Sequence, residues 1–229
     1  MSFELAIRLT EILMGLAFIQ YSLEHLPSFK YERALFTARI ILSGLLIIGM
    51  ATMWVTFTLF VLALVILHRF QGPYNGGADR LGLLMLSCLC LVHLAPTVYW
   101  KEIAFGYLAL QVVLSYFISG WVKLVNPQWR DGRALQDVFL FSTYPVSESL
   151  RRLAGSPRLL WLLSWYVMAF EVLFPLALFS QPVLVGALVI TGSFHFSNAC
   201  LFGLNRFFWI WLAAYPSLLW LQERMLITL

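Results

Sequence analysis

Charged residues are scarce in this chain of 229 residues, because Asp, Glu, Lys and Arg together make up only 11% of it. An ordinary soluble domain is about a quarter charged and about half apolar. Here 61% of the residues are hydrophobic, and the mean hydropathy is +0.84. The polar residues are too few to cover a water-exposed globule. The composition therefore excludes a soluble enzyme, a disordered chain and a collagen-like fibre, and it indicates a membrane protein.

Cysteines and metal-ligand patterns are equally sparse. The three cysteines, Cys88, Cys90 and Cys200, are odd in number and lie inside apolar stretches, which excludes a disulfide framework. We expect them to be small hydrophobic side chains. The four histidines have neither the spacing of two helical metal ligands nor a suitably spaced Glu partner. The sequence therefore predicts no metal site.

Eight apolar segments are candidates for membrane-spanning helices, which need about 20 mostly apolar residues. They cover residues 3–23, 40–54, 55–67, 81–95, 103–122, 159–179, 183–202 and 207–221. The second and third follow each other directly, so they are either two spans or one long kinked segment. The predicted fold is all-α, a polytopic transmembrane helix bundle of about eight spans. We expect a single integral membrane domain over residues 1–229.

The polar segments between these spans suggest how the chain lies in the membrane. The longest, residues 123–158, is expected to contain short interfacial helices near 134–142 and 147–153. Eight spans place both termini on one side, with three of the 15 Lys and Arg residues, and leave the other 12 opposite. The positive-inside rule then predicts a multi-pass cell-membrane protein with extracytoplasmic termini. Residues 1–26 lack a cleavable signal pattern, so we expect the N-terminus to be part of the fold.

Lys123 is the most informative of the ionisable residues in or near the spans. Such residues are costly in a membrane unless they are paired or hydrated, so each is a functional candidate. Ser115, Ser119 and Lys123 recur every four residues and share one helical face, with Tyr116 beside it and Gly120 allowing close approach. A lysine in a low-dielectric pocket can act as a base. The alternative is a side chain that extends into the headgroup layer.

Two further spans carry polar groups near their middle. Glu171 is too deep in its span to reach the interface, so it either faces the bundle interior or pairs with a basic group. His195 and Asn198 stand three residues apart on one helical face, and either line a cavity or form interhelical hydrogen bonds. Asp79 precedes the fourth span and is either a helix cap or part of a site.

Two blocks of the sequence resemble the membrane domain shared by vitamin K-dependent gamma-carboxylases and the HTTM (horizontally transferred transmembrane) family. The first is residues 116–124, YFISGWVKL, followed by Trp129, Gly132 and residues 134–135. The second is residues 194–203, FHFSNACLFG, followed by Phe207 and Pro216. Between the blocks, Glu171 stands where the carboxylases carry an acidic residue. The resemblance is clearest over residues 75–221.

The resemblance implies a helical bundle with a polar cavity for a lipid-soluble molecule. Lys123 takes the position of the base that deprotonates reduced vitamin K, and Glu171, His195 and Asn198 are expected to line the same cavity. We therefore predict Lys123, His195 and Glu171 as catalytic residues. A quinone or quinol of the vitamin K type is the implied cofactor. Its predicted contacts are Tyr116, Ser119, Gly120, Asn198 and Asp79.

Two functional interpretations remain open at this stage. The first is a membrane enzyme, a quinol-dependent oxidase, epoxidase or carboxylase-like lyase, that uses Lys123 as a general base. The second is a non-catalytic membrane subunit or assembly factor that binds a lipid, a quinone or a partner protein. Gly77 stands where the carboxylases have a histidine, which favours quinol chemistry or quinone binding over carboxylation. The expected partners are membrane lipid and a peptide, a protein substrate or a membrane subunit, but no nucleic acid. A transporter is disfavoured, because no paired broken helices recur in two halves.

Overall fold

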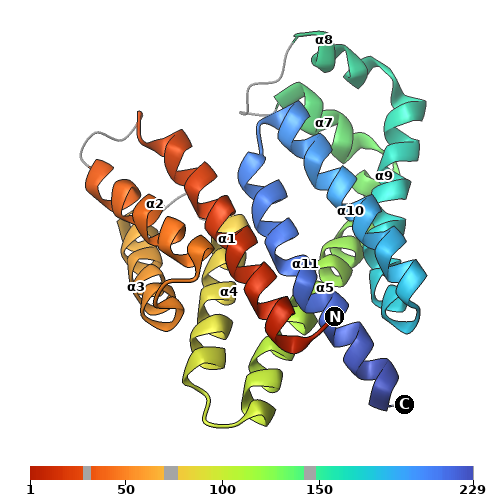
Figure 1. Cartoon of the computed structure of the whole chain (residues 1–229). Helices are drawn as coiled ribbons and strands as arrows, with labels where there is room; N and C mark the ends of the chain where they lie inside the picture. The colour runs from red at the N-terminus through yellow and green to blue at the C-terminus, as the bar shows by residue number, and fades with distance from the viewer. Residues whose placement is uncertain (28–31, 70–76, 142–147, 229) are drawn as a thin grey trace. The chain divides into compact units, whose positions relative to one another are not determined.

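The computed structural model describes residues 1–27, 32–69, 77–141 and 148–228. Every regular element in these ranges is a helix, which confirms the predicted all-α class (Figure 1). The long helices are α1 (Phe3–His25), α2 (Arg33–Ile48), α3 (Thr52–Arg69), α4 (Gly77–Leu94), α5 (Val98–Val125), α9 (Pro157–Leu173), α10 (Gln181–Phe202) and α11 (Asn205–Thr228). The short ones are α6 (Pro127–Arg130), α7 (Arg133–Phe141), α8 (Glu148–Arg151) and the 3₁₀ helices η1 (Arg152–Gly155) and η2 (Phe174–Phe179).

Five segments in the described ranges are long and apolar enough to cross a membrane. They are α3, α4, α5, α9 together with η2, and α10. These candidate spans support a multi-pass membrane protein. The other three predicted spans correspond to helices α1, α2 and α11, which are not among the five. The 16 residues of α2 fall short of the length that a perpendicular crossing needs.

The break between the second and third predicted spans lies earlier than the sequence pattern indicated. The prediction of two separate segments is confirmed, but the predicted break between residues 54 and 55 is wrong, and so is the alternative of one long kinked segment. Helix α2 ends at Ile48 because Gly49 adopts φ +81° and donates its N–H to the carbonyls of Leu45 and Leu46. Only glycine takes this left-handed conformation without strain, and it is the usual helix terminator. Helix α3 begins three residues later, at Thr52.

The helices fall into two compact units, which we describe separately. Unit 1 comprises Met1–Leu110 and Asn205–Leu229, and unit 2 comprises Gln111–Leu204. The prediction of a single domain stays a prediction. In unit 1, α1 packs against α2 and α11, while α3 packs against α2 and α4 (Figure 1). Close packing of α1 on α2 depends on Gly15, where a β-carbon would lie 2.7 Å from the side chain of Ile47.

A charged network fixes the N-terminal half of α1 to the end of α2. Arg8 donates hydrogen bonds to the carbonyls of Leu46, at 2.7 Å, and Ile47, and so satisfies carbonyls that the helix end leaves free. It also pairs with Glu11 at 3.0 Å, and Glu11 lies 2.8 Å from Nε2 of His93 on α4. Glu11 is 2% exposed, so its charge is balanced inside unit 1.

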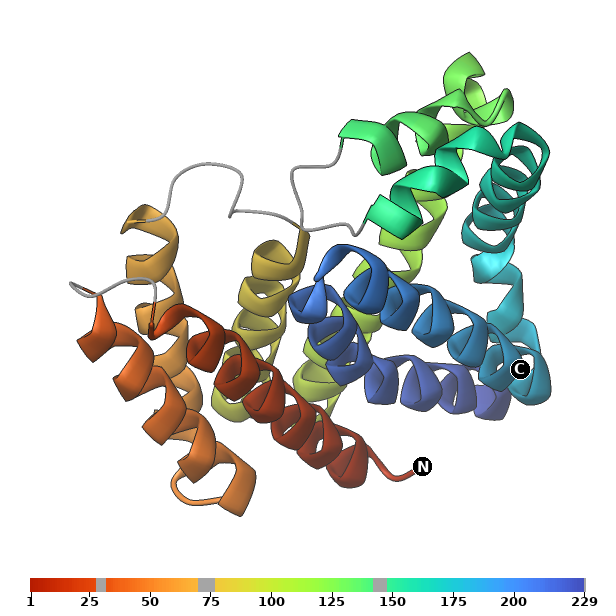
Figure 2. The same ribbon diagram turned by 90° about the horizontal axis from the view of Figure 1, so that it is seen from above.

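In unit 2 the short connecting helices pack on one helix, α9. Helices α6 and α7 and the 3₁₀ helix η1 pack against it, and Phe139, Ala154, Leu160 and Phe202 form a buried cluster. Pro175 cannot donate a helical hydrogen bond, and at this point α9 gives way to η2. Figure 2 shows η2 redirecting the chain from α9 into α10. The predicted connecting helices correspond to α7 and to α8 with η1. Their predicted boundary residues 142 and 147 lie outside the described ranges.

Candidate functional site

Lys123 lies in the last turn of α5, and its ammonium group turns back along the helix. Nζ donates a hydrogen bond to Oγ of Ser119 at 2.6 Å, one helical turn earlier. The spacing of four residues makes this contact possible, because side chains at i and i+4 share a helix face. The lysine side chain is only 17% exposed. The predicted polar face of α5 is therefore occupied by a linked serine and lysine.

Glu171 of α9 completes this cluster. Its carboxylate oxygens lie 2.9 and 2.6 Å from Nζ of Lys123, and one of them accepts a hydrogen bond from Ser119 at 3.2 Å. The glutamate side chain is 4% exposed. An isolated buried charge would be strongly unfavourable, so the ion pair and the serine hydroxyl together make this arrangement stable.

Gly120 explains how α5 and α9 come close enough for this ion pair. A β-carbon at Gly120 would lie 2.7 Å from Cβ of Glu171 and 2.7 Å from the backbone nitrogen of Val172. Real β-carbons do not approach other atoms so closely, so any larger residue would push the two helices apart. Gly120 thus acts by being small, and the sequence had indicated this role.

The segment after α5 places an aromatic ring beside the lysine. Asn126 caps α6 by accepting the N–H of Gln128 at 2.9 Å, and Pro127 occupies the first helical position. Helix α9 then binds the end of this short helix, because the indole N–H of Trp165 donates a hydrogen bond to the backbone carbonyl of Arg130 at 3.1 Å. As a result, Nζ of Lys123 lies 5.4 Å from the centre of the Trp129 ring, within the range of a cation–π contact.

A second polar pair lies two turns before Lys123 on α5. The hydroxyl of Tyr116 is 3.0 Å from Nε2 of His195 on α10. Both residues are buried, at 2% and 5% exposure. The ring of Phe174 packs against Tyr116 at 4.4 Å between centroids. This phenol–imidazole pair is a hydrogen-bonded connection between α5 and α10 in an apolar surrounding.

An open pocket of about 550 Å³ adjoins the lysine. Its wall is mostly apolar and aromatic, with Trp129, Phe141 and Phe194 among the lining residues. The polar lining groups are Lys123, Asn198 and Asp137. Small-molecule sites typically measure about 300–1,000 Å³ and combine apolar walls with a few polar groups. The pocket has the size and lining of such a site.

The predicted site residues are only partly brought together. Lys123, Ser119, Gly120 and Glu171 form one cluster, and Lys123 and Asn198 line the pocket. Glu171 and His195 were expected to line the same cavity, but they are not among the lining residues of this pocket. Glu171 supports the lysine from α9, and His195 is turned towards Tyr116.

Asp79 is engaged elsewhere, in unit 1, where it pairs with Arg206 at 3.4 Å. Sequence reasoning did not assign Trp129, Phe194 or Asp137 to the site. The Asn126–Pro127 helix start could have indicated Trp129, because it predicts a turn that reverses the chain beside Lys123. Among the described residues, no group of three His, Cys, Asp or Glu side chains could hold a metal ion.

Comparison with known proteins identifies one family. The family model of the HTTM domain matches residues 94–222, which is more than half of the chain. The match includes the lysine cluster, the phenol–imidazole pair and the pocket, and it begins after Asp79. No curated protein and no solved structure matches the chain.

Proposed function

Because this chain belongs to the HTTM domain family, we propose that it is a multi-pass membrane enzyme in which Lys123 deprotonates a hydroxyl group of a quinol. The observation that carries this proposal is the position of Lys123. The residue lines an apolar pocket of about 550 Å³, and its Nζ is held by Ser119 and Glu171. A flat, apolar compound with an ionisable hydroxyl fits such a wall better than a sugar or a peptide does.

The pair of Lys123 and Glu171 can hold its proton in two ways. With the proton on Nζ it is an ion pair, and with the proton on the carboxylate it is a neutral amine beside a carboxylic acid. A low-dielectric surrounding reduces the preference for the charged form. In the neutral form, Nζ has a lone pair and can accept a proton from a hydroxyl in the pocket. Ser119 holds the amine in place in both forms.

The pocket residues fit a quinone ring by their chemistry. Aromatic groups such as Trp129 and Phe194 offer faces for stacking, and the amide of Asn198 can donate to or accept from a ring oxygen. A bound hydroquinone would supply the acidic hydroxyls and the electron-rich ring that redox chemistry with oxygen requires. The chain's own contributions are orientation, exclusion of water and removal of one proton at Nζ.

The remaining features of the proposal concern the membrane. We propose that α1, α2 and α11 cross it together with the five apolar spans, which gives eight crossings, with the bilayer thinned locally around the short helix α2. Both termini then lie outside the cytoplasm, opposite the basic connections. Membrane lipid surrounds the bundle, and a peptide, a protein substrate or a second membrane subunit is the expected macromolecular partner.

The test combines turnover with binding. Protein purified in detergent is supplied with a reduced naphthoquinone and oxygen, and the absorbance of the oxidised product is followed. Lys123→Ala should abolish the enzyme-dependent rate while binding of the quinone, measured by native mass spectrometry, persists. Lys101→Ala removes a lysine from the opposite end of α5 and should behave like the wild type. An unchanged rate in Lys123→Ala would overturn the proposal.

A second function, non-catalytic binding, is favoured by one observation. Nζ of Lys123 already contacts Ser119 and both oxygens of Glu171, as expected of an ion pair that locks α5 to α9. In that case a quinone or another lipid co-purifies with the protein, but no variant or wild-type sample consumes the reduced compound. The same measurements therefore separate the two functions.

A further inference from the structure

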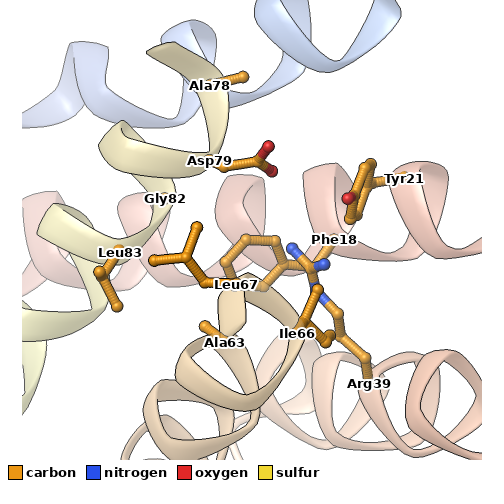
Figure 3. Close-up of a pocket in the computed structure, with 10 residues that line it drawn as sticks. All are labelled: Phe18, Tyr21, Arg39, Ala63, Ile66, Leu67, Ala78, Asp79, Gly82 and Leu83. Atoms are coloured by element: carbon orange, nitrogen blue, oxygen red, sulfur yellow. The ribbon is translucent and has the colours of Figure 1, made fainter. Parts of the chain in front are cut away.

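Unit 1 contains a second polar site, which is independent of the lysine cluster. It is a small cavity of about 40 Å³ lined by residues of α1, α2, α3 and α4 (Figure 3). Arg39 of α2 extends into it and is only 7% exposed. Figure 3 shows its guanidinium group beside the ring of Phe18, with Asp79 and Tyr21 pointing towards the same space.

The faces of this guanidinium group are covered by aromatic rings. Its central carbon lies 4.1 Å from the centre of the Phe18 ring and 4.5 Å from that of Tyr21. Stacking of this kind satisfies the positive charge in part but leaves the N–H groups at the edge, since they lie in the plane of the group. The ring faces offer no acceptor in the plane of the five N–H donors of the group.

Charge balance points in the same direction. Asp79 is ion-paired with Arg206, which also lies over the ring of Tyr21 at 5.0 Å. Within the part of the chain that the structure describes, no carboxylate lies at ion-pairing distance from Arg39. Asp79, the carboxylate that lines the cavity, is therefore already paired with an arginine other than Arg39. A buried guanidinium group without a carboxylate at ion-pairing distance is well placed to bind an anion with several acceptor oxygens.

The first turn of α4 borders another side of the cavity. Ala78 and Asp79 line it from the first turn of α4, an 18-residue helix whose first N–H groups have no acceptor within the helix. A helix N-terminus attracts anions through these groups and through its dipole. Arg39, nine-tenths buried and extending into the same cavity, is the independent second feature that makes this helix end a candidate site.

From this arrangement we propose that the Arg39 cavity binds a phosphate group. A volume of about 40 Å³ holds roughly three water-sized groups, which is enough for the unesterified oxygens of one phosphate group, two in a phospholipid diester and three in a monoester. The planar N–H fork of arginine fits two phosphate oxygens at once. The phosphate belongs either to a lipid headgroup or to a free anion.

The position of the cavity along the helices places it near the edge of the membrane, at the level of the lipid headgroups. The cavity lies at the C-terminal ends of α1 and α3 and the N-terminal end of α4, where Tyr21, Ile66 and Ala78 line it. Helix ends of membrane spans lie near headgroup level. A phospholipid can therefore present its phosphate here without moving its acyl chains out of the apolar layer.

Two binding measurements on the full chain test the proposal. Equilibrium dialysis with radiolabelled inorganic phosphate at constant ionic strength reports the free anion. Native mass spectrometry of protein from bilayers of phosphatidylglycerol or phosphatidylcholine reports the lipid. We expect one phosphate group per chain and about ten- to a hundredfold weaker binding in Arg39→Met, from loss of charge-assisted hydrogen bonds. Arg33→Met, which removes an exposed arginine from the same helix, should bind like the wild type.

The two measurements show whether the phosphate group belongs to a free anion or to a lipid headgroup. Saturable phosphate binding without lipid retention assigns the free anion, and Arg39-dependent retention of phosphatidylglycerol assigns the headgroup. Either result supports the proposal. Arg39→Lys, which keeps the charge but loses the planar fork, replaces Arg39→Met if that variant does not fold. A wild-type protein that binds neither probe has water in the cavity, and the proposal is then wrong. Equal binding by the Arg39 and Arg33 variants would also overturn it.

Discussion

Gly120 and Val172 approach each other so closely that a β-carbon on the first would lie 2.7 Å from the backbone nitrogen of the second. This contact between α5 and α9 sets the separation at which Lys123 reaches Glu171. The ion pair therefore depends on a residue with no functional group of its own.

Replacing Gly120 by alanine should destabilise unit 2 by about 1–3 kcal/mol, because the added methyl group forces the helices apart. Thermal unfolding in detergent measures this change. Gly186→Ala is the matched control, since a β-carbon there meets nothing within 4 Å. That variant should be neutral or slightly more stable, because alanine is the better helix former. A fully stable Gly120→Ala would contradict the close contact.

Removing one member of the Lys123–Glu171 pair should cost more than removing both. Lys123→Met leaves a carboxylate that is 4% exposed without its cation, at a cost of about 3 kcal/mol. The double variant Lys123→Met, Glu171→Leu should recover most of this loss. A double-mutant cycle of unfolding free energies is expected to give a coupling of about 0.5–3 kcal/mol. Additive effects would show that the two groups do not interact.

Arg8 should be the most important arginine for the stability of unit 1. Arg8→Met removes hydrogen bonds to the carbonyls of Leu46 and Ile47 and takes the cation from Glu11, and should cost about 2–4 kcal/mol. The control is Arg224→Met. Arg224 pairs with Glu102 but is 47% exposed, so its loss should cost less than about 1 kcal/mol. Equal melting temperatures for the two variants would refute this ranking.

Unit 1 should lose stability in mild acid through His25. Burial lowers the pKa of this imidazole below its ordinary 6.5; nearby Arg206 and Arg39 lower it further, against the opposing Tyr21 carbonyl and Glu24. The folded state therefore resists protonation, and the stability present above pH 6.5 declines as pH falls towards the lowered value. Melting temperatures between pH 8 and pH 5 measure the decline.

The control variant for that experiment is His25→Phe. It keeps a ring against Tyr21, whose centroid lies 4.3 Å from that of His25, but it cannot take up a proton. Its melting temperature should vary less with pH than that of the wild type. His68→Asn changes an exposed ring on α3 and should leave the wild-type profile intact. A profile unchanged by His25→Phe would exclude His25 as the source of the decline.

The pattern of apolar residues was sufficient to predict the helices, because membrane helices carry a strong compositional signal. It did not place the break after Ile48, since Gly49 lies between apolar residues on both sides and periodicity does not change there. Backbone conformation decided that boundary. A glycine followed three residues later by the start of a new helix is a local signal that is lost when hydropathy is averaged over a window.

The candidate site was predictable where its residues share one helix. Ser119, Gly120 and Lys123 follow from helical spacing alone. Their partner Glu171 is 48 residues away from Lys123, and only packing brings the two together. Asp79 shows the converse, since a polar residue at a helix start looked like part of the same site but pairs with Arg206 in unit 1. The spacing of polar residues along one helix does not show which other helix packs against that helix.

The length of α5 has a consequence for the lysine near its end. Its 28 residues span about 42 Å, roughly 12 Å more than the hydrocarbon layer. If Trp100 sits at headgroup level at one end, the surplus falls on the final turns, and these carry Lys123. Bilayer thickness then sets how far these turns stand out of the hydrocarbon layer: a thin membrane leaves them among hydrated headgroups, whereas a thick one surrounds them with acyl chains. Lipid composition would thus change the surroundings of the lysine without any change in the protein.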